Sequence, residues 1–234
     1  MLYDASRAGN AELCWLDRDW WARRGEVQES DEGRGAALFI HADGRRLVLR
    51  HYRRGGWAAR VSTDRYLWRE ADATRSFVEW HLLYLMRRAG LPVPVPIAAC
   101  YRRTGRHSYS ADLLTEQIIG VRSLAAHLAA APLPLSGWIA IGRCLRRFHD
   151  DGVFHADLNA HNILMDEDRR VWLIDFDRGR LRRPGLWCDG NLVRLRRSVE
   201  KITAPLPAGH FADADWASLI DAYFAAAQPA TASP

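Results

Sequence analysis

The sequence predicts an α+β protein of two lobes, a small strand-rich lobe with one helix and a mainly helical lobe after it. Short apolar runs separated by turn sequences, the pattern of antiparallel strands, fill most of the chain before residue 115. After that point the composition shifts to helix-forming residues, interrupted by one predicted hairpin. The length of 234 residues leaves room for two lobes of about a hundred residues each. We therefore expect a first lobe over 1–115, a hinge over 116–120 and a second lobe over 121–234, together forming one domain.

The first lobe is expected to begin with a lead-in segment and to continue as strands around one helix. Tryptophans at positions 15, 20 and 21 predict that residues 1–25 pack against the body of the lobe. Strands are expected over 26–29, 36–41, 47–49, 96–101 and 110–115. Residues 53–72 show no periodicity and are expected to form a loop, whereas 74–88 has the spacing of an amphipathic helix that Gly90 ends. The apolar residues at helical spacing there are Phe77, Val78, Leu82, Leu85 and Met86.

The second lobe is expected to consist of helices around one short hairpin. Helices are expected over 123–130, 136–150 and 213–227. The core positions of the middle helix are expected to be Ile139, Ile141, Leu145 and Phe148. Strands are expected over 162–165 and 171–174, on either side of the turn sequence D-E-D. An arginine-rich region over 178–197 follows, and we assign it no secondary structure from the sequence.

The charge of the chain indicates an anionic partner. The net charge is +5, and Lys201 is the single lysine among 33 basic residues, so the other 32 are arginines. Genomic base composition is one source of such a bias. Whatever its source, each arginine offers a planar, permanently charged fork suited to phosphate and carboxylate groups. Nucleic acid, an anionic membrane surface or a phosphorylated substrate would all fit the charge. No recognised nucleic-acid-binding motif occurs, and aromatic residues do not alternate with the basic runs, so we expect no nucleic acid partner.

Cysteine usage and hydropathy narrow the class further. Cys14, Cys100, Cys144 and Cys188 are widely spaced and are expected to be buried thiols in a reducing compartment. The histidines and cysteines lack the spacing of zinc ligands, so no zinc site is expected. No stretch reaches 18 apolar residues, and the N-terminus lacks the pattern of a secretory signal, so neither a spanning helix nor a signal peptide is expected.

Three oxygen-bearing side chains are predicted to meet at one end of the hairpin of the second lobe. Asp157 lies in a loop after the middle helix, Asn162 begins the first strand of the hairpin, and Asp175 follows the second strand. Because the hairpin brings these strand ends together, the three side chains can converge, and Mg²⁺ prefers such oxygen ligands. The pattern H-x-D-x-x-x-x-N followed by Asp-Phe is the catalytic and metal signature of the protein-kinase-like fold. The expected fold is therefore a protein-kinase-like two-lobed α+β fold.

The first lobe contains candidates for the complementary phosphate-binding groups. Arg50 stands in the strand that carries a phosphate-binding lysine in this fold, and Glu79 on the next helix is its natural partner. Gly33 and Gly35 flank a turn where a phosphate-covering loop belongs, although an ordinary tight hairpin would also explain a single G-x-G. Arg60 competes with Arg50 for the phosphate role, and we favour Arg50.

Four segments resemble the 3-deoxy-D-manno-octulosonic acid (Kdo) kinases, a family of small lipopolysaccharide-core kinases of Gram-negative bacteria related to the heptose kinases. The segments are H-A-D-L-N-A-H-N-I-L, I-D-F-D-R-G-R, V-L-R-H-Y-R-R-G-G and T-R-S-F-V-E-W-H-L-L, and the similarity covers nearly the whole chain from Trp20. The resemblance implies that Asp157 is the catalytic base and that Asn162 and Asp175 hold Mg²⁺ on ATP. It also implies that Arg50 and Glu79 position the phosphates, with Gly33 and Gly35 in the covering loop. The backbone of Glu116, Gln117 and Ile118 is implied as the hinge that binds adenine.

The resemblance further implies that the γ-phosphoryl group of ATP moves to a hydroxyl, usually the 4-hydroxyl, of Kdo linked to a lipid A precursor. Three departures from protein kinases agree with a constitutively assembled enzyme that has a small-molecule or glycolipid acceptor. Ala156 replaces an arginine that grips a phosphorylated activation loop, Asn159 replaces a lysine at the transferred phosphate, and no A-P-E segment follows Asp175. Asp177 replaces the usual glycine and suggests a less mobile metal loop. Asn159, Arg178 and Arg180 are expected to contact the acceptor.

The second arginine cluster is expected to bind anionic groups of this acceptor and of the membrane that carries it. It comprises Arg178, Arg180, Arg182, Arg183, Arg194, Arg196 and Arg197, with Leu186 and Trp187 between them. We expect peripheral attachment to the cytoplasmic face of the inner membrane, with Leu186 and Trp187 entering the interface. No obligate protein partner is expected. The alternatives are a heptose kinase or another small-molecule phosphotransferase of the same fold, and less favoured a nucleotide-binding pseudokinase or a nucleic-acid-binding protein.

Overall fold

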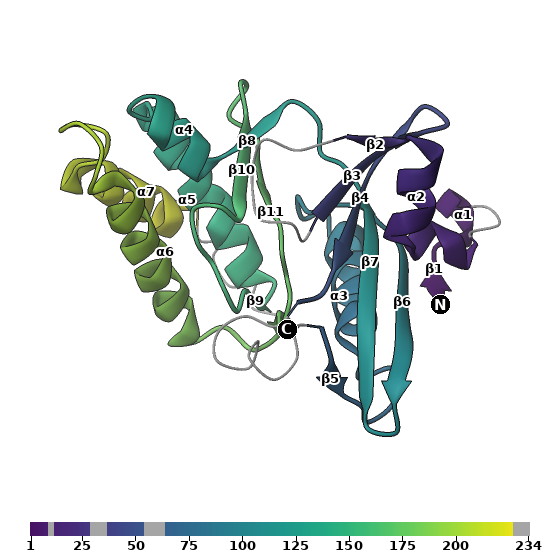
Figure 1. The fold of residues 1–234 in the computed structure, drawn as a ribbon. Helices are drawn as coiled ribbons and strands as arrows, with labels where there is room; N and C mark the ends of the chain where they lie inside the picture. Colours follow the sequence, from purple (N-terminus) through teal and green to yellow (C-terminus); the bar gives the residue numbers. More distant parts are fainter. Residues whose placement is uncertain (9–11, 29–36, 54–63, 227–234) are drawn as a thin grey trace. The chain divides into compact units, whose positions relative to one another are not determined.

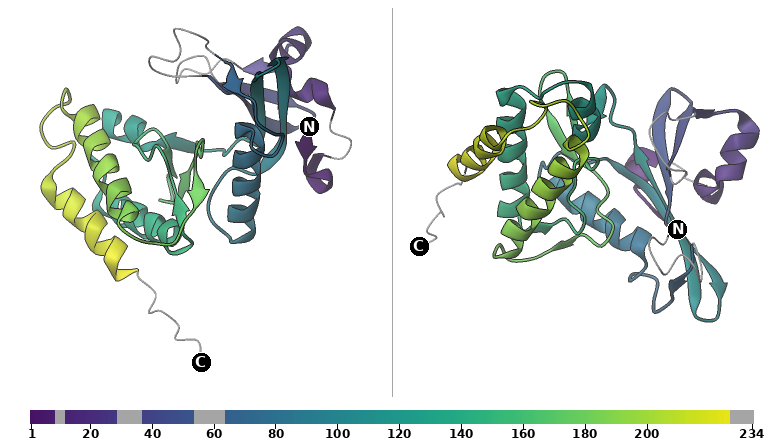
Figure 2. Two further views of the ribbon diagram at one scale, coloured as in Figure 1. Left: turned by 90° about the horizontal axis from the view of Figure 1, so that it is seen from below. Right: turned by 60° about the vertical axis from the view of Figure 1, so that its left-hand side comes forward.

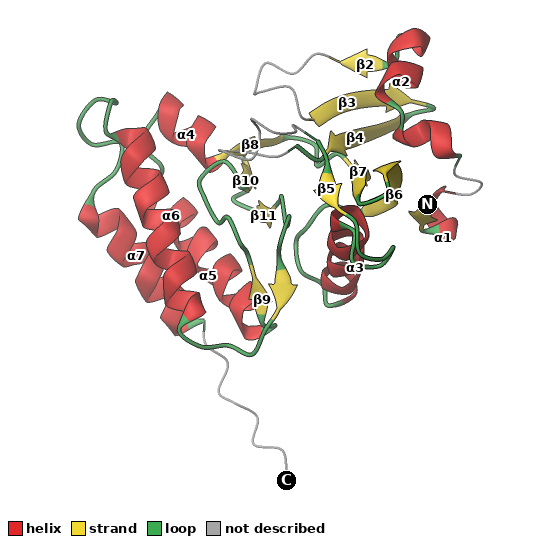
Figure 3. Cartoon of the chain, turned by 60° about the horizontal axis from the view of Figure 1, so that its bottom comes forward, coloured by secondary structure: helices red, strands yellow, loops and turns green. Residues whose placement is uncertain are grey.

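The strand-rich part of the chain comes first and the mainly helical part second, as the sequence predicts (Figure 3). The first part contains short helical segments near the N-terminus besides the one helix expected. The structure, a computed structural model, describes residues 1–8, 12–28, 37–53 and 64–226. The chain divides into two compact units. The first comprises Met1–Arg88 and Pro94–Ile118, and the second comprises Ala89–Val93 and Ile119–Pro234. The short connector Ala89–Val93 thus belongs with the second unit, where the N–H of Leu173 donates to the carbonyl of Pro92.

The core of the first unit is an antiparallel sheet (Figure 1). Its strands follow the order β1-β6-β7-β4-β3-β2, and β5 pairs with the outer part of β7. The strands are β1 (Leu2–Tyr3), β2 (Val27–Gln28), β3 (Ala37–Ala42), β4 (Arg45–His51), β5 (Tyr66–Leu67), β6 (Pro96–Gly105) and β7 (Ser108–Glu116). Strands β4, β6 and β7 are longer than the sequence predicts, and β5 lies in a segment that we expected to be a loop.

The β3–β4 hairpin follows directly from its turn sequence. Asp43 and Gly44 both adopt the left-handed conformation, with φ of 50° and 72°, between the paired residues Ala42 and Arg45. Two central residues with positive φ are what a two-residue hairpin turn of the right twist requires, and Asp-Gly is a favoured pair for it. The hairpin sets the register in which Arg50 of β4 lies opposite Ala37 of β3, and on its other side Arg50 pairs with Leu113 of β7.

Helix α3 (Arg75–Arg88) packs one face of the sheet, and its buried stripe differs from the predicted one. Phe77, Leu82 and Met86 are buried as expected. Val78 and Leu85 are 42% and 48% exposed, so the prediction of core positions was wrong for these two. Residues seven apart share a helix face, and this face lies away from the buried one. The buried face includes Trp80, Leu83 and a carboxylic acid, Glu79.

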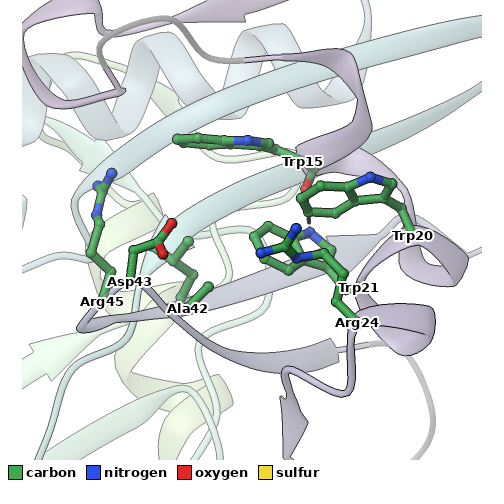
Figure 4. A pocket seen from close by; sticks show the side chains of 8 residues that line it. Trp15, Trp20, Trp21, Arg24, Ala42, Asp43 and Arg45 are labelled. Carbon is green, nitrogen blue, oxygen red and sulfur yellow. Dashed lines mark hydrogen bonds between the residues drawn. The ribbon is translucent and has the colours of Figure 1, made fainter.

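The N-terminal segment packs on the sheet, as its tryptophans predict. It contains α1 (Ala5–Ala8), the 3-10 helix η1 (Leu13–Leu16) and α2 (Arg18–Arg24). Leu16 and Trp21 are buried in the same cluster as Ile40, Leu47 and Leu49 of the sheet. Figure 4 shows the hollow that Trp15, Trp20 and Trp21 form beside β3 and β4. Its volume of about 40 Å³ suits one or two water molecules, so it is no site for a nucleotide or a sugar.

The second unit is built on helices that lie side by side (Figures 1 and 2). They are α4 (Leu124–Ala130), α5 (Leu135–Asp150), α6 (Trp187–Thr203) and α7 (Asp213–Ala225). Helices α4, α5 and α7 lie where the sequence predicts them. In α5, Ile141, Leu145 and Phe148 are buried as expected, whereas Ile139 is only half-buried. Helix α6 occupies the arginine-rich region that we left without an assignment.

Two small sheets complete the second unit. Strands β8 (Val121–Ser123), β10 (Ile163–Asp166) and β11 (Val171–Leu173) form one, in the order β11-β10-β8. Strands β9 (Val153–Phe154) and β12 (Arg180–Leu181) form the other. The predicted hairpin is therefore present as β10 and β11. The loop between β9 and β10 carries the H-A-D-L-N-A-H-N motif.

The four cysteines are free thiols. Cys100, Cys144 and Cys188 are buried as expected, but Cys14 is half-exposed, so the prediction was wrong for that residue. Burial raises the pKa of the Cys100 and Cys144 thiols to about 12, and both remain protonated at neutral pH.

Candidate active site

The loop between β9 and β10 presents the side chain of Asp157 to solvent. The carboxylate is 66% exposed. Its Oδ2 atom accepts a hydrogen bond from Asn159 Nδ2 at 3.2 Å, and the same nitrogen donates to the carbonyl of Asp157 at 3.1 Å. Asn159, predicted to contact the acceptor, therefore orients the carboxylate within its own loop.

His155 connects this loop to the residue that precedes Asp175. The His155 ring is 2% exposed. Its Nδ1 atom accepts from the backbone N–H of Asp157 at 3.1 Å, so the proton of the neutral ring is assigned to Nε2. Nε2 then donates to the carbonyl of Ile174 at 2.9 Å. One buried ring thus fixes the backbone at Asp157 and the backbone next to Asp175.

Asn162 completes the connection between the two aspartates. Its side-chain Nδ2 atom donates to the backbone carbonyl of Asp157 at 2.9 Å. The backbone carbonyl of Asn162 accepts from the N–H of Ile174 at 3.0 Å. Because Nδ2 is used in this way, the Oδ1 atom of the amide is the one that can accept a hydrogen bond or bind a cation. Asp175 follows Ile174 in the left-handed conformation, with φ of 63°. The structure therefore brings Asp157, Asn162 and Asp175 together at one end of β10 and β11.

Helix α6 supports the loop from its other side, and sequence reasoning missed this helix. Asn191 is buried and pairs with the backbone of His155, donating to its carbonyl at 2.8 Å and accepting from its N–H at 3.4 Å. Ser198 Oγ accepts from the N–H of Ala160 at 3.1 Å. Between these two anchors, Arg194 Nη1 lies 3.7 Å from Asp157 Oδ1. Leu192, Leu195 and Val199 recur at helical spacing and are the signal that could have identified α6.

In the first unit, Arg50 and Glu79 form the predicted ion pair. Arg50 Nη1 lies 2.7 Å from Glu79 Oε1, and the carboxylate is 2% exposed. Tyr52 donates its hydroxyl to Glu79 Oε2 at 2.5 Å, a contact that the sequence did not reveal. The observed pair supports Arg50 over Arg60, which lies outside the described residues, as do Gly33 and Gly35.

The segment from Glu116 to Ile118 ends the first unit. The N–H of Glu116 donates to the carbonyl of Val95, and the N–H of Gln117 donates to the carbonyl of Arg46, both at 2.9 Å. These bonds hold the segment at the end of β7. Arg45 Nη2 lies 3.7 Å from the Glu116 carboxylate.

The two other predicted acceptor contacts follow the Asp-Phe-Asp sequence, Arg178 in a turn and Arg180 on the next strand. Arg180 lies on β12, and its guanidinium stacks over the Phe154 ring at 5.4 Å. Arg178 is exposed, and its φ of 61° is left-handed. Neither position contradicts a contact with the acceptor. Arg194 is the arginine that the structure places beside Asp157.

Comparison with known proteins identifies the family. Residues 18–223 match the model of the lipopolysaccharide kinase (Kdo/WaaP) family. The chain belongs to this family. It is 47% identical over 203 residues to the 3-deoxy-D-manno-octulosonic acid kinase of Xanthomonas campestris pv. campestris (strain B100), covering 86% of this chain and 80% of the relative. A kinase with the same description from Stenotrophomonas maltophilia (strain K279a) is 48% identical over 206 residues, with the same coverage.

A solved structure confirms the kinase-like α+β fold. The structure described as WaaP in complex with acyl carrier protein superimposes with a TM-score of 0.56, covering 87% of this chain and 79% of that chain. The two sequences are 20% identical, so the likeness concerns the fold alone. As a member of a lipopolysaccharide kinase family, the chain is a phosphotransferase, and membership of a kinase family implies the use of ATP.

The described residues lack two kinds of feature, a metal-binding cluster and a membrane-spanning helix. Within them, no group of three or more His, Cys, Asp and Glu side chains is arranged to hold a metal ion. The oxygen pair of Asn162 and Asp175 is smaller than such a group and suits a cation that also binds phosphate oxygens and water. In the same part of the chain, no helix combines the length and the hydropathy needed to cross a bilayer.

Proposed function

We propose that this protein transfers the γ-phosphoryl group of ATP to a hydroxyl, the 4-hydroxyl, of Kdo attached to a lipid A precursor. The observation that carries the proposal is the Asp157 carboxylate, which is exposed to solvent on a loop that buried polar groups hold in place. Relatives at 47% identity described as Kdo kinases support the choice of acceptor. They favour it over a heptose kinase and over a pseudokinase.

Asp157 acts as the base in this mechanism. An acceptor hydroxyl within hydrogen-bond distance of a carboxylate oxygen gives up its proton to that oxygen as its own oxygen approaches the γ-phosphorus. Phosphoryl transfer needs little covalent chemistry from the protein, so positioning contributes most of the rate. His155 and Asn162 hold the backbone of Asp157, and Asn159 orients its carboxylate, before the substrate arrives.

Asn162 and Asp175 are the residues that would hold Mg²⁺. Their amide and carboxylate oxygens are the hard ligands that this ion prefers, and the Asn162 amide is oriented by its bond to the Asp157 carbonyl. When bound, Mg²⁺ neutralises charge on the phosphates. The left-handed backbone of Asp175 is uncommon for a residue other than glycine, and such conformations occur often at active sites.

The first unit supplies the nucleotide-binding groups. Arg50, held by the buried Glu79 carboxylate, is the cation for the ATP phosphates. Glu79 is itself held by Tyr52, so the arginine has one preferred position. The N–H groups of Glu116 and Gln117 already donate within the unit. We assign adenine recognition to the backbone of Glu116, Gln117 and Ile118, as the resemblance to the kinase family implies.

Peripheral attachment to the cytoplasmic face of the inner membrane completes the proposal, because the acceptor is a glycolipid. The structure changes which residues of the arginine cluster can contribute. Trp187 is half-buried and packs against His149 and Phe154. Leu186 is 89% exposed and remains available. Arg196 is paired with Glu200 and Asp213, whereas Arg183 and Arg197 are among the exposed cations of the cluster.

The choice of acceptor is tested by offering labelled ATP together with purified glycolipids. A lipid A precursor ending in Kdo should accept the label, and a core oligosaccharide ending in heptose should not. Label on the heptose acceptor alone would make the chain a heptose kinase.

A further inference from the structure

Helix α6 runs alongside the loop that carries Asp157, and three positions on one face of the helix meet three positions of the loop in order. Asn191 contacts His155, and Ser198 contacts Ala160. Arg194 lies between these anchors and reaches toward Asp157. Residues 191, 194 and 198 are separated by three and four positions and so share a helix face. The guanidinium of Arg194 is therefore placed by two hydrogen-bonded anchors, one on each side.

The contact between Arg194 and Asp157 leaves the guanidinium open to another ligand. The distance of 3.7 Å is longer than a hydrogen bond, and the two side chains are 53% and 66% exposed. Within the described residues, the structure pairs Arg194 with no carboxylate other than Asp157. Arg196, two residues later, differs: it binds Glu200 at 2.7 Å and Asp213 at 2.6 Å. Arg196 is used within the protein, whereas Arg194 presents its donors beside the catalytic loop.

We propose that Arg194 binds the carboxylate of the acceptor sugar and thereby selects a sugar acid over a neutral sugar. This inference rests on the proposed function. The acceptor hydroxyl must lie within hydrogen-bond distance of Asp157, so the sugar ring lies next to the guanidinium. A planar guanidinium binds a carboxylate through two parallel hydrogen bonds, a geometry that a hydroxyl cannot match. Arg194 is thus a specificity-determining residue, separate from the base.

The experiment measures steady-state kinetics with two acceptors dispersed in neutral detergent. One is the Kdo-terminated lipid A precursor as the free acid, and the other is the same glycolipid with the Kdo carboxylate methyl-esterified. Arg194→Ala is compared with the unaltered protein, with Arg194→Lys and with Lys201→Ala. Lys201 is exposed on the same helix, seven residues and about 10 Å away, and its replacement makes the same change in charge.

With the free acid, Arg194→Ala should raise KM for the acceptor by about ten- to a hundredfold and change kcat little, because a charge-assisted pair is lost. Esterification should raise KM of the unaltered protein by a similar factor and cause little further loss in Arg194→Ala. Arg194→Lys should recover part of the loss, and Lys201→Ala should resemble the unaltered protein. KM for ATP should remain unchanged in all variants.

Four results would overturn the inference. Equal losses with both acceptors, or a fall in kcat alone, would mean that Arg194 only positions Asp157. A raised KM for ATP would mean that Arg194 binds a nucleotide phosphate. An equal loss in Lys201→Ala would mean general electrostatic attraction. Failure of the proposed function gives a different result, since the unaltered protein would then transfer phosphate to neither acceptor.

Discussion

Asp157 faces solvent, whereas the side chains that fix its position are buried. His155 and Asn191 are each 2% exposed, and the Asn191 side chain hydrogen-bonds the backbone N–H and carbonyl of His155. This division suits a base that must meet a substrate without moving. The exposed group can change partners during turnover while the buried groups keep the loop in place.

Replacing the base should abolish phosphoryl transfer and leave nucleotide binding nearly unchanged. Asp157→Ala should reduce turnover to background and leave ATP affinity within about threefold, because the base acts on the acceptor in the transition state. Asp175→Ala should instead lose Mg²⁺-dependent nucleotide binding. Phosphate transfer and binding of a fluorescent ATP analogue measure the two effects. If Asp157→Ala kept the turnover of the unaltered protein, its assignment as the base would be wrong.

The residues of the site differ in how far the sequence predicts them. Asp157, Asn162 and Asp175 lie within one short stretch of chain, and their spacing around a hairpin is enough to predict that they meet. Asn191 and Arg194 act on the same loop from a helix some 36 residues away from His155. Their roles depend on how α6 packs, and no local pattern contains that information.

Among the helices of the second unit, α6 is the one that the sequence analysis did not assign. Its apolar stripe of Leu192, Leu195 and Val199 is regular, but arginines occupy most of the positions between them. These arginines obscure the helical spacing of the apolar residues. The remaining predicted elements have plain signals, such as the Asp-Gly turn before β4 and the long apolar face of α5.

Contact between α5 and α7 depends on a glycine. A Cβ atom at Gly142 would lie 2.2 Å from the carbonyl oxygen of Leu219, so Gly142→Ala must push the two helices apart. We expect a loss of about 1–3 kcal/mol in the free energy of unfolding, measured by urea denaturation. Gly190→Ala is the control, since no atom lies within 4 Å of its Cβ position, and it should stabilise α6 by about 0.5–1 kcal/mol. Equal effects of the two substitutions would contradict this packing.

The same helices make stability depend on pH through His149. Burial lowers the pKa of His149 to about 4, and its Nδ1 atom pairs with the hydroxyl of Tyr223 at 2.8 Å. The nearby groups Asn191 and Asp150 favour the charged ring and Arg146 opposes it, but burial dominates. The unfolded chain therefore binds more protons than the folded one between pH 6.5 and about 4. The stabilisation is complete above pH 6.5 and is lost as pH falls through this window.

Lowering the pH from 7.5 to 5 should reduce the free energy of unfolding by about 2 kcal/mol through His149 alone. Urea denaturation at the two pH values measures the change. His149→Gln removes the titrating group. Between pH 7.5 and pH 5, the free energy of unfolding of this variant should therefore fall by about 2 kcal/mol less than that of the unaltered protein. Parallel falls in the two proteins would show that His149 is not the group responsible.

For the molecule as a whole, the positions of the exposed cations decide how the net charge of +5 contributes to membrane binding. Arg183 and Arg197 are exposed, and so is Leu186, an apolar side chain that extends into solvent. Because an arginine near an anionic bilayer contributes about 1 kcal/mol, Arg183→Ala with Arg197→Ala should weaken partitioning to anionic vesicles roughly thirtyfold. Flotation with vesicles containing phosphatidylglycerol measures this effect.

Arg169→Ala with Arg170→Ala is the matched control, since it removes the same charge from the β10–β11 turn. This control should bind anionic vesicles as the unaltered protein does. Vesicles of phosphatidylcholine alone should bind the protein more weakly than anionic vesicles. Equal losses in the two double variants, or equal binding to neutral and anionic vesicles, would argue against the membrane surface proposed for this region.

The central claim is that Asp157, Asn162 and Asp175 form one site for phosphoryl transfer to a glycolipid. Its most direct test is mass spectrometry of the Kdo–lipid A precursor after incubation with the protein, ATP and Mg²⁺. We predict that the precursor gains one phosphate and that Asp157→Ala adds none. An unchanged precursor in the presence of folded protein that binds ATP would contradict the claim.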